Sequence, residues 1–124
     1  MNYKPIPAAI ENLEFDNRFV RELPADPDPA NNRRPVYAAC YSRVKPQNVR
    51  APQLVAYSKE MADVLDIPPA VCESPYFTQL MAGNLLAPQM EPYATCYGGH
   101  QFGNWAGQLG DGRAINLGEV INRQ

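Results

Sequence analysis

The sequence contains few residues of the types that bind metals, membranes or nucleic acids. Its 124 residues include one histidine, one tryptophan and three cysteines, and no lysine follows Lys59. No apolar run approaches the roughly 18 residues that a membrane-spanning helix needs, and the first ten residues do not form a signal peptide. Eleven basic against thirteen acidic residues give a net charge of −2, without the basic excess of a nucleic-acid-binding protein. The sequence therefore predicts a cytoplasmic protein with neither a membrane nor a nucleic-acid partner.

The three cysteines, Cys40, Cys72 and Cys96, are odd in number and far apart in the sequence. This pattern argues against a disulfide framework and favours a reducing compartment. Cys96 and His100 stand four residues apart, but two ligands do not make a zinc site, and the sequence has no CxxC pair to complete one. We therefore expect no metal ligand among these residues.

Thirteen prolines punctuate the chain, and most of them fall in its first three-quarters. The segment 23–35, LPADPDPANNRRP, predicts an exposed and partly extended connection. Before it, NLEFDNRFVREL at 12–23 predicts a short strand or a turn. After it, 35–46 is rich in β-branched and aromatic residues and predicts a short strand or extended segment. Residues 1–50 are thus expected to form an extended lead within at most one ordinary domain.

Residues 51–90 are expected to be helical, with two short helices. The first begins at Pro52, a first-turn position, and ends before Pro68 and Pro69. Its apolar positions recur three and four residues apart on one face: Leu54, Tyr57, Met61, Val64 and Leu65. The second begins at Ser74 and Pro75, a capping residue and a first-turn proline, and ends at Gly83 and Asn84. Both helices are predicted to be packing elements.

Seven of the eight glycines lie between Tyr97 and Val120, in YGGHQFGNWAGQLGDGRAINLGEV. The segments 104–109 (NWAGQL) and 113–120 (RAINLGEV) have the length of strands. Gly110-Asp111-Gly112 lies between them, and glycine adopts the positive φ of a tight turn without steric cost. The sequence predicts that 91–124 contains a hairpin made of these two strands and this glycine turn.

Three glycines in six residues, Gly107, Gly110 and Gly112, are more than a turn requires. Bare backbone amides can line an anion site, and Arg113 adds a guanidinium suited to phosphate oxygens. The segment lacks the lysine and hydroxyl residue of a Walker A loop, whereas the glycine-rich cover of a protein kinase also joins two strands. These residues favour a polyphosphate site, and the alternative is a hairpin turn that binds no ligand.

The run YGGHQFGNWAGQLGDGRAINLGE closely resembles the signature of the selenoprotein O family, the SelO or YdiU protein adenylyltransferases. The upstream segments LEFDNRFVRELPAD, VYAACYSRVKPQNVRAPQLVAYSKEMADVLDI and GNLLAP resemble the family as well. The resemblance implies an α+β fold, the incomplete N-terminal part of a protein-kinase-like fold in which ATP lies reversed. It also implies transfer of AMP onto serine, threonine or tyrosine hydroxyls of protein substrates, with Mg²⁺ or Mn²⁺.

By the same resemblance, the nucleotide contacts fall on Gly110, Gly112 and Arg113. Asp111 is interpreted as the turn former, and His100 as a hydrogen-bonded structural histidine. No role is predicted for two other residues of the signature, Gln101 and Trp105.

The family's catalytic lysine, its partner acid, the catalytic aspartate and the metal ligands all correspond to positions beyond Gln124. We therefore expect no catalytic residue and no metal ligand within this chain, which would be the inactive opening piece of a longer enzyme. Two alternatives stay open. One is a pseudokinase module that binds nucleotide without transferring anything, and the other is a structural or interaction domain without a ligand.

Overall fold

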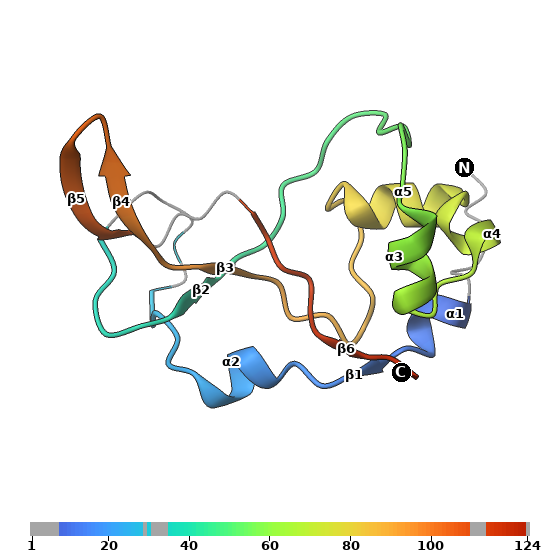
Figure 1. The fold of residues 1–124 in the computed structure, drawn as a ribbon, viewed down its shortest axis with the longest axis horizontal. Helices are drawn as coiled ribbons and strands as arrows, with labels where there is room; N and C mark the ends of the chain where they lie inside the picture. The colour runs from blue at the N-terminus through green and yellow to red at the C-terminus, as the bar shows by residue number, and fades with distance from the viewer. Residues whose placement is uncertain (1–7, 29, 31–34, 110–113, 124) are drawn as a thin grey trace. The chain divides into compact units, whose positions relative to one another are not determined.

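The computed structural model describes residues 8–28, 30, 35–109 and 114–123. The chain divides into two compact units, each built from segments distant in sequence. Among the described residues, the helical unit comprises 8–16, 47–90 and 119–123, and the strand unit comprises those of 17–46 and 91–118. The described chain mixes short helices with small antiparallel sheets, which confirms the predicted α+β class (Figure 1).

The helical unit contains α1 (Ala8–Glu11), α3 (Lys59–Val64), α4 (Pro69–Cys72) and α5 (Pro75–Met81). Two very short strands, β1 (Glu14–Phe15) and β6 (Val120–Ile121), pair antiparallel in the same unit. The helices bury one apolar cluster, in which the side chains of Leu80 and Cys72 are fully buried. The other buried members are Ile10, Ala62, Ile67, Val71, Tyr76, Phe77 and Ala87.

The predicted limits of the second helix are confirmed. The Ser74 hydroxyl accepts the amide N–H of Phe77 at 3.3 Å, and Pro75 occupies the first turn of α5. Gly83 follows the helix with φ +85°, the left-handed conformation that ends many helices.

The predicted start of the first helix is wrong, because α3 begins at Lys59 and not at Pro52. The Ser58 hydroxyl accepts the amide N–H of Met61 at 3.1 Å, so a second capping residue inside the apolar pattern starts the helix. Val55 is 97% exposed and Leu54 is 39% exposed. Tyr57 packs against the core of the helical unit, but its two apolar neighbours Leu54 and Val55 are exposed, so the segment 52–58 has no continuous apolar face to bury as a helix.

Three further helices occur where the sequence predicted none, and one of them, α4, begins at Pro69, a residue that was expected to end the first helix. The extended lead contains α1, and the expected strand or turn at 12–23 divides into β1 and α2 (Arg18–Glu22). Asn17 precedes α2 in the left-handed conformation, with φ +48°. This conformation separates strand from helix within four residues, a break that the apolar spacing does not reveal.

The strand unit contains α2, β2 (Tyr41–Arg43), β3 (Tyr93–Thr95), β4 (Tyr97–Gln101) and β5 (Asn104–Leu109). β2 confirms the extended segment predicted at 35–46 and pairs antiparallel with β3. A cluster of rings covers this pair: Phe19 stacks on Tyr93 with centroids 5.0 Å apart, and Tyr41 meets Tyr93 edge-on. Tyr41 is 1% exposed, and its hydroxyl donates to the carbonyl of Val20.

The predicted strand at 104–109 is confirmed as β5, but its predicted partner is wrong. β5 pairs with the preceding strand β4, with His100 opposite Trp105 and Gln101 opposite Asn104. The two residues between the strands, Phe102 and Gly103, have φ of +51° and +77°, as a type I′ turn requires. The Phe102-Gly103 turn therefore closes the described hairpin. The predicted turn at Gly110-Asp111-Gly112 lies outside the described residues.

Residues 114–120 are the described part of the predicted second strand. They take part in two other pairings. Asn116 bridges to Tyr93 in the strand unit, and Val120 belongs to β6. It therefore does not form a continuous strand beside β5.

Candidate functional site

The three predicted nucleotide contacts, Gly110, Gly112 and Arg113, lie outside the described residues, as does Asp111. The structure does describe the residues on both sides, Leu109 at the end of β5 and Ala114. The candidate site is therefore characterised by what holds these two flanks.

The flank before the glycine segment is held by residues 35–39. The amide N–H of Val36 donates to the carbonyl of Gln108 at 2.9 Å. The side-chain Nε2 of Gln108 donates to the carbonyl of Ala39 at 2.7 Å, and Leu109 forms a β-bridge with Pro35. Val36 and Ala39 are both buried, whereas Gln108 is half-buried. Main-chain and side-chain bonds thus hold the last two residues before Gly110.

The flank after the glycine segment is held by β3. Tyr93 and Asn116 exchange both backbone hydrogen bonds, at 3.0 Å and 2.8 Å. Tyr93 is 6% exposed within the ring cluster, so its backbone is a firm point of attachment. Residues 110–113 therefore connect two points that the strand unit holds by hydrogen bonds. Sequence analysis missed Gln108 and the Tyr93–Asn116 pair, because no local pattern identifies a partner so distant in the chain.

Several glycines of the signature have structural roles in the hairpin. A Cβ atom on Gly98 would lie 2.7 Å from Cη2 of Trp105, and one on Gly99 would lie 2.7 Å from Cδ1 of Leu109. Gly103 and Gly107 have φ of +77° and +83°. Ring packing, close approach and backbone conformation therefore account for these four glycines without a ligand. Gly107, one of the three glycines expected to leave backbone amides bare, lies inside β5.

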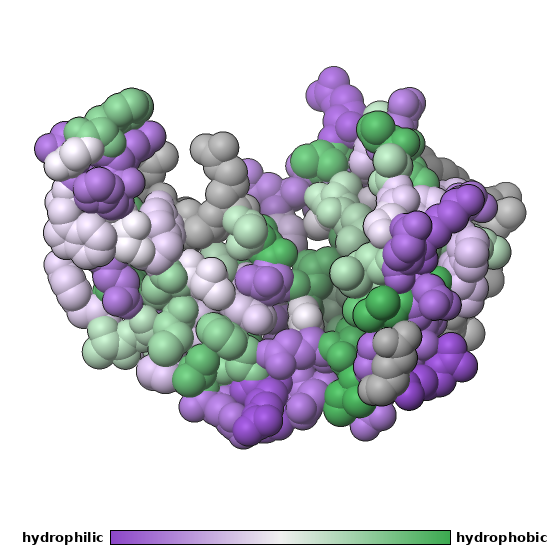
Figure 2. All heavy atoms as spheres, viewed as in Figure 1, coloured by the Kyte–Doolittle hydropathy of each residue, from purple (hydrophilic) through white to green (hydrophobic). Residues whose placement is uncertain are grey.

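The β4–β5 hairpin exposes large aromatic side chains. Phe102 at the turn is 92% exposed and Trp105 is 68% exposed. Figure 2 shows hydrophobic residues reaching the outer end of this hairpin. His100 lies on β4 opposite Trp105 and is exposed to solvent. This exposure does not support the predicted role of a structural histidine.

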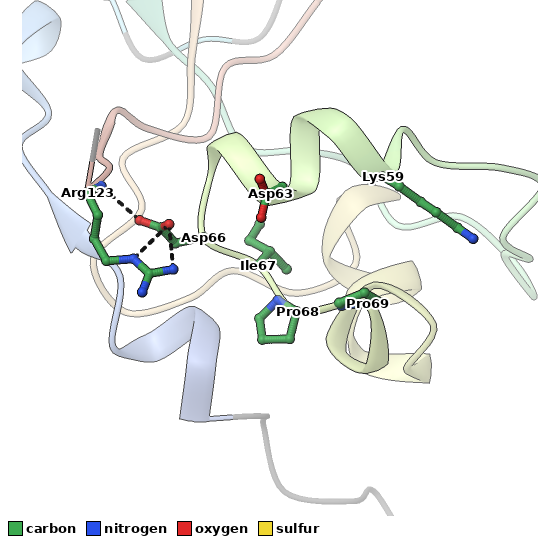
Figure 3. A pocket seen from close by; sticks show the side chains of 7 residues that line it. All are labelled: Lys59, Asp63, Asp66, Ile67, Pro68, Pro69 and Arg123. Carbon is green, nitrogen blue, oxygen red and sulfur yellow. Dashed lines mark hydrogen bonds and ion pairs between the residues drawn. The ribbon is translucent and has the colours of Figure 1, made fainter.

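A cavity of about 330 Å³ lies in the helical unit. Figure 3 shows Arg123 folded against Asp66, with Lys59 directed away from this pair. The Arg123 guanidinium donates to Oδ1 of Asp66 from Nε and Nη2, both at 2.9 Å, and its backbone N–H donates to Oδ2 at 2.9 Å. The Asp66 carboxylate is thereby committed to holding the segment after β6. The cavity is also lined by Asp63, Ile67, Pro68 and Pro69.

Within the described ranges, no group of three or more histidine, cysteine, aspartate or glutamate side chains could hold a metal ion. None of the described helices is long and apolar enough to cross a membrane.

Comparison with known proteins identifies a family whose members resemble this chain. A model of the family described as protein adenylyltransferase SelO matches residues 31–124. The protein nucleotidyltransferase YdiU of Methylobacillus flagellatus is 62% identical over 112 residues, which cover 90% of this chain and 22% of that protein. Its counterpart in Aromatoleum aromaticum is 60% identical over 90% of this chain and 21% of that protein. The counterpart in Rhodopirellula baltica is 60% identical over 89% of this chain and 20% of that protein. The chain spans about a fifth of the length of these curated relatives.

Proposed function

Because the chain belongs to the SelO protein adenylyltransferase family, we propose that the intact protein transfers AMP from ATP to hydroxyl groups of other proteins. The acceptors are serine, threonine or tyrosine side chains, and the fold of the whole enzyme is protein-kinase-like. The family and its nucleotidyltransferase relatives support the transfer of a nucleotide. The protein acceptor and the kinase-like fold are parts of the proposal.

One observation supports placing a nucleotide at residues 110–113: both flanks of this segment are hydrogen-bonded to the strand unit. Binding a polyphosphate costs less when the ends of the binding loop are already held. The glycine amides of Gly110 and Gly112 would donate to phosphate oxygens, and Arg113 would pair with them through its planar guanidinium.

The chemistry is a substitution at the α-phosphorus of ATP. The acceptor hydroxyl oxygen bonds to this phosphorus, the bond to the bridging oxygen breaks, and pyrophosphate leaves while the hydroxyl proton passes to a base. The residues of this chain bind and orient the phosphates. A divalent cation would neutralise the leaving pyrophosphate. As the resemblance to the family implies, we propose that its ligands lie outside this chain.

Substitution of Arg113 in the intact protein tests the site. Arg113→Ala should weaken ATP binding by roughly 1.5–3 kcal/mol, the range for hydrogen bonds to charged groups. Arg113→Lys should restore only part of the affinity, because an ammonium group lacks the two-pronged geometry. Arg18→Ala is the matched control, since Arg18 is exposed and pairs only with Glu22 in its own helix among the contacts described. Unchanged ATP affinity in Arg113→Ala would remove Arg113 from the site.

Isotopic labelling tests the reaction. The intact protein with Mg-ATP should label protein acceptors from the α-phosphate of ATP and not from the γ-phosphate, with release of pyrophosphate. Labelling from the γ-phosphate alone would identify a kinase and refute AMP transfer. Binding of ATP without labelling from either position would leave a nucleotide-binding pseudokinase.

A further inference from the structure

Two cysteines that are far apart in the sequence occupy opposite backbone positions in the strand unit. The register of β2 and β3 pairs Tyr41 with Thr95, and its continuation by one residue sets Cys40 opposite Cys96. The amide N–H of Cys96 donates to the carbonyl of Cys40 at 2.9 Å, so the pairing does extend to these residues. The absence of a disulfide pattern in the sequence therefore does not exclude a single bond between them.

The Cα spacing expected of such a pair falls within the range found in disulfide bonds. Opposite residues in a hydrogen-bonded antiparallel pair have Cα atoms about 5.5 Å apart. Disulfides join cysteines whose Cα atoms lie about 4.4–6.8 Å apart, most often near 5.5–6 Å. Disulfide Cβ atoms lie about 3.5–4.5 Å apart, whereas opposite Cβ atoms in an antiparallel pair lie about 4.5–5.5 Å apart. A bond between Cys40 and Cys96 would therefore draw the two chain segments together within the same register, and the strain would make the bond readily reducible.

Both side chains are half-buried and are present as thiols, so a small oxidant can reach them. The backbone is also held, because the amide N–H of Cys40 donates to the carbonyl of Pro24 at 2.8 Å. The third cysteine differs: Cys72 is fully buried in the core of the helical unit, and burial raises the pKa of its thiol. A raised pKa reduces the thiolate fraction that exchange requires.

We propose that Cys40 and Cys96 form a reversible disulfide bond when the thiol pool of the cell becomes oxidising. With glutathione disulfide as the oxidant, one cysteine thiolate attacks a glutathione sulfur, forms a mixed disulfide and releases one glutathione thiolate. The second cysteine thiolate then attacks the protein sulfur of that mixed disulfide and releases the other glutathione. The two cysteines lose two electrons and two protons, and one glutathione disulfide is reduced to two glutathione molecules.

The bond would join two positions at the base of the hairpin. Cys96 directly precedes β4, and Cys40 directly follows Ala39, whose carbonyl accepts the Gln108 side chain. Oxidation would therefore fasten the backbone that supports one flank of the glycine segment. This inference does not depend on AMP transfer, because the disulfide can be detected without any substrate.

The experiment uses the intact protein, incubated with glutathione disulfide, blocked with N-ethylmaleimide and digested with trypsin and glutamyl endopeptidase. These proteases place Cys40 in peptide 34–43, Cys72 in 61–73 and Cys96 in 74–113. The expected product is 34–43 joined to 74–113, lighter than the two reduced peptides by two hydrogen atoms and separated again by dithiothreitol.

Matched variants make the assignment specific. Cys72→Ser should still give the joined peptides. Cys96→Ser should give none, and should instead accumulate glutathione on Cys40. Separate recovery of 34–43 and 74–113 from the oxidised wild-type protein, whether alkylated or carrying glutathione, would overturn the proposal. So would pairing of either cysteine with Cys72 or with any cysteine outside this chain.

Discussion

Replacing Gln108 with alanine tests whether its side chain holds the flank of the proposed nucleotide segment. The Nε2 atom of Gln108 donates to the carbonyl of Ala39 at 2.7 Å, and Ala39 is 8% exposed. An unsatisfied buried acceptor costs about 1–3 kcal/mol. Since Gln108 is itself half-buried, water can partly replace the lost donor, and we expect the low end, about 1 kcal/mol. That free energy corresponds to about a fivefold change in an equilibrium constant.

Two measurements on the intact protein should report this loss. The amide of Val36, which donates to the Gln108 carbonyl, should exchange its hydrogen about fivefold faster through local opening. The ATP dissociation constant should rise by a similar factor if Gly110–Arg113 bind the phosphates. Gln108→Glu should be worse than Gln108→Ala, because a carboxylate oxygen would then face the carbonyl of Ala39.

Gln101→Ala is the matched control, since it removes the same side chain from an exposed position on β4. It should change neither measurement. If Val36 exchange and ATP affinity were both unchanged in Gln108→Ala, Gln108 would not hold this flank. Faster Val36 exchange with unchanged ATP affinity would keep the structural role and refute the link to nucleotide binding.

Two further substitutions test the packing of the strand unit. Gly98→Ala should displace the Trp105 ring and shift the tryptophan fluorescence to the red, because the new Cβ would lie 2.7 Å from Cη2. Gly103→Asn is the control and should leave the ring in place, since asparagine tolerates positive φ. An unshifted spectrum in Gly98→Ala would contradict the packing. Tyr41→Phe should lower the free energy of unfolding by about 1–2 kcal/mol in urea titrations, because the buried carbonyl of Val20 loses its donor, and an unchanged midpoint would count against that bond.

Local signals predicted elements well where one capping residue and one apolar face agreed. Ser74 and Gly83 bracket α5 as expected, because a hydroxyl cap and a left-handed glycine act within a few residues. Capping by a hydroxyl also explains why α3 starts later than the sequence predicted. Ser58 lies within an apolar spacing that suits a longer helix, and its cap determines where the helix starts.

Strand pairing was beyond local signals. The limits of β5 follow from the sequence, but its partner depended on a choice between two glycine-containing turns, and the Phe102-Gly103 turn forms the described hairpin. Gln108, whose partner Ala39 is distant in the chain, carries no pattern of its own. The resemblance to the SelO family is confirmed by the matching family model. The nucleotide contacts at Gly110, Gly112 and Arg113 stay a prediction.

The pairing of β1 with β6 has a consequence for how the protein is made. The partners of residues 14–15, at 120–121, are synthesised roughly a hundred residues after them. Joining such distant segments carries a loop-closure cost and slows folding relative to local contacts. The short helices α3, α4 and α5 can form on the growing chain, whereas this sheet can form only after Ile121 has emerged. We therefore expect a ribosome-bound chain that stops short of β6 to be cleaved readily by protease around β1, and one extending well past it to be protected there.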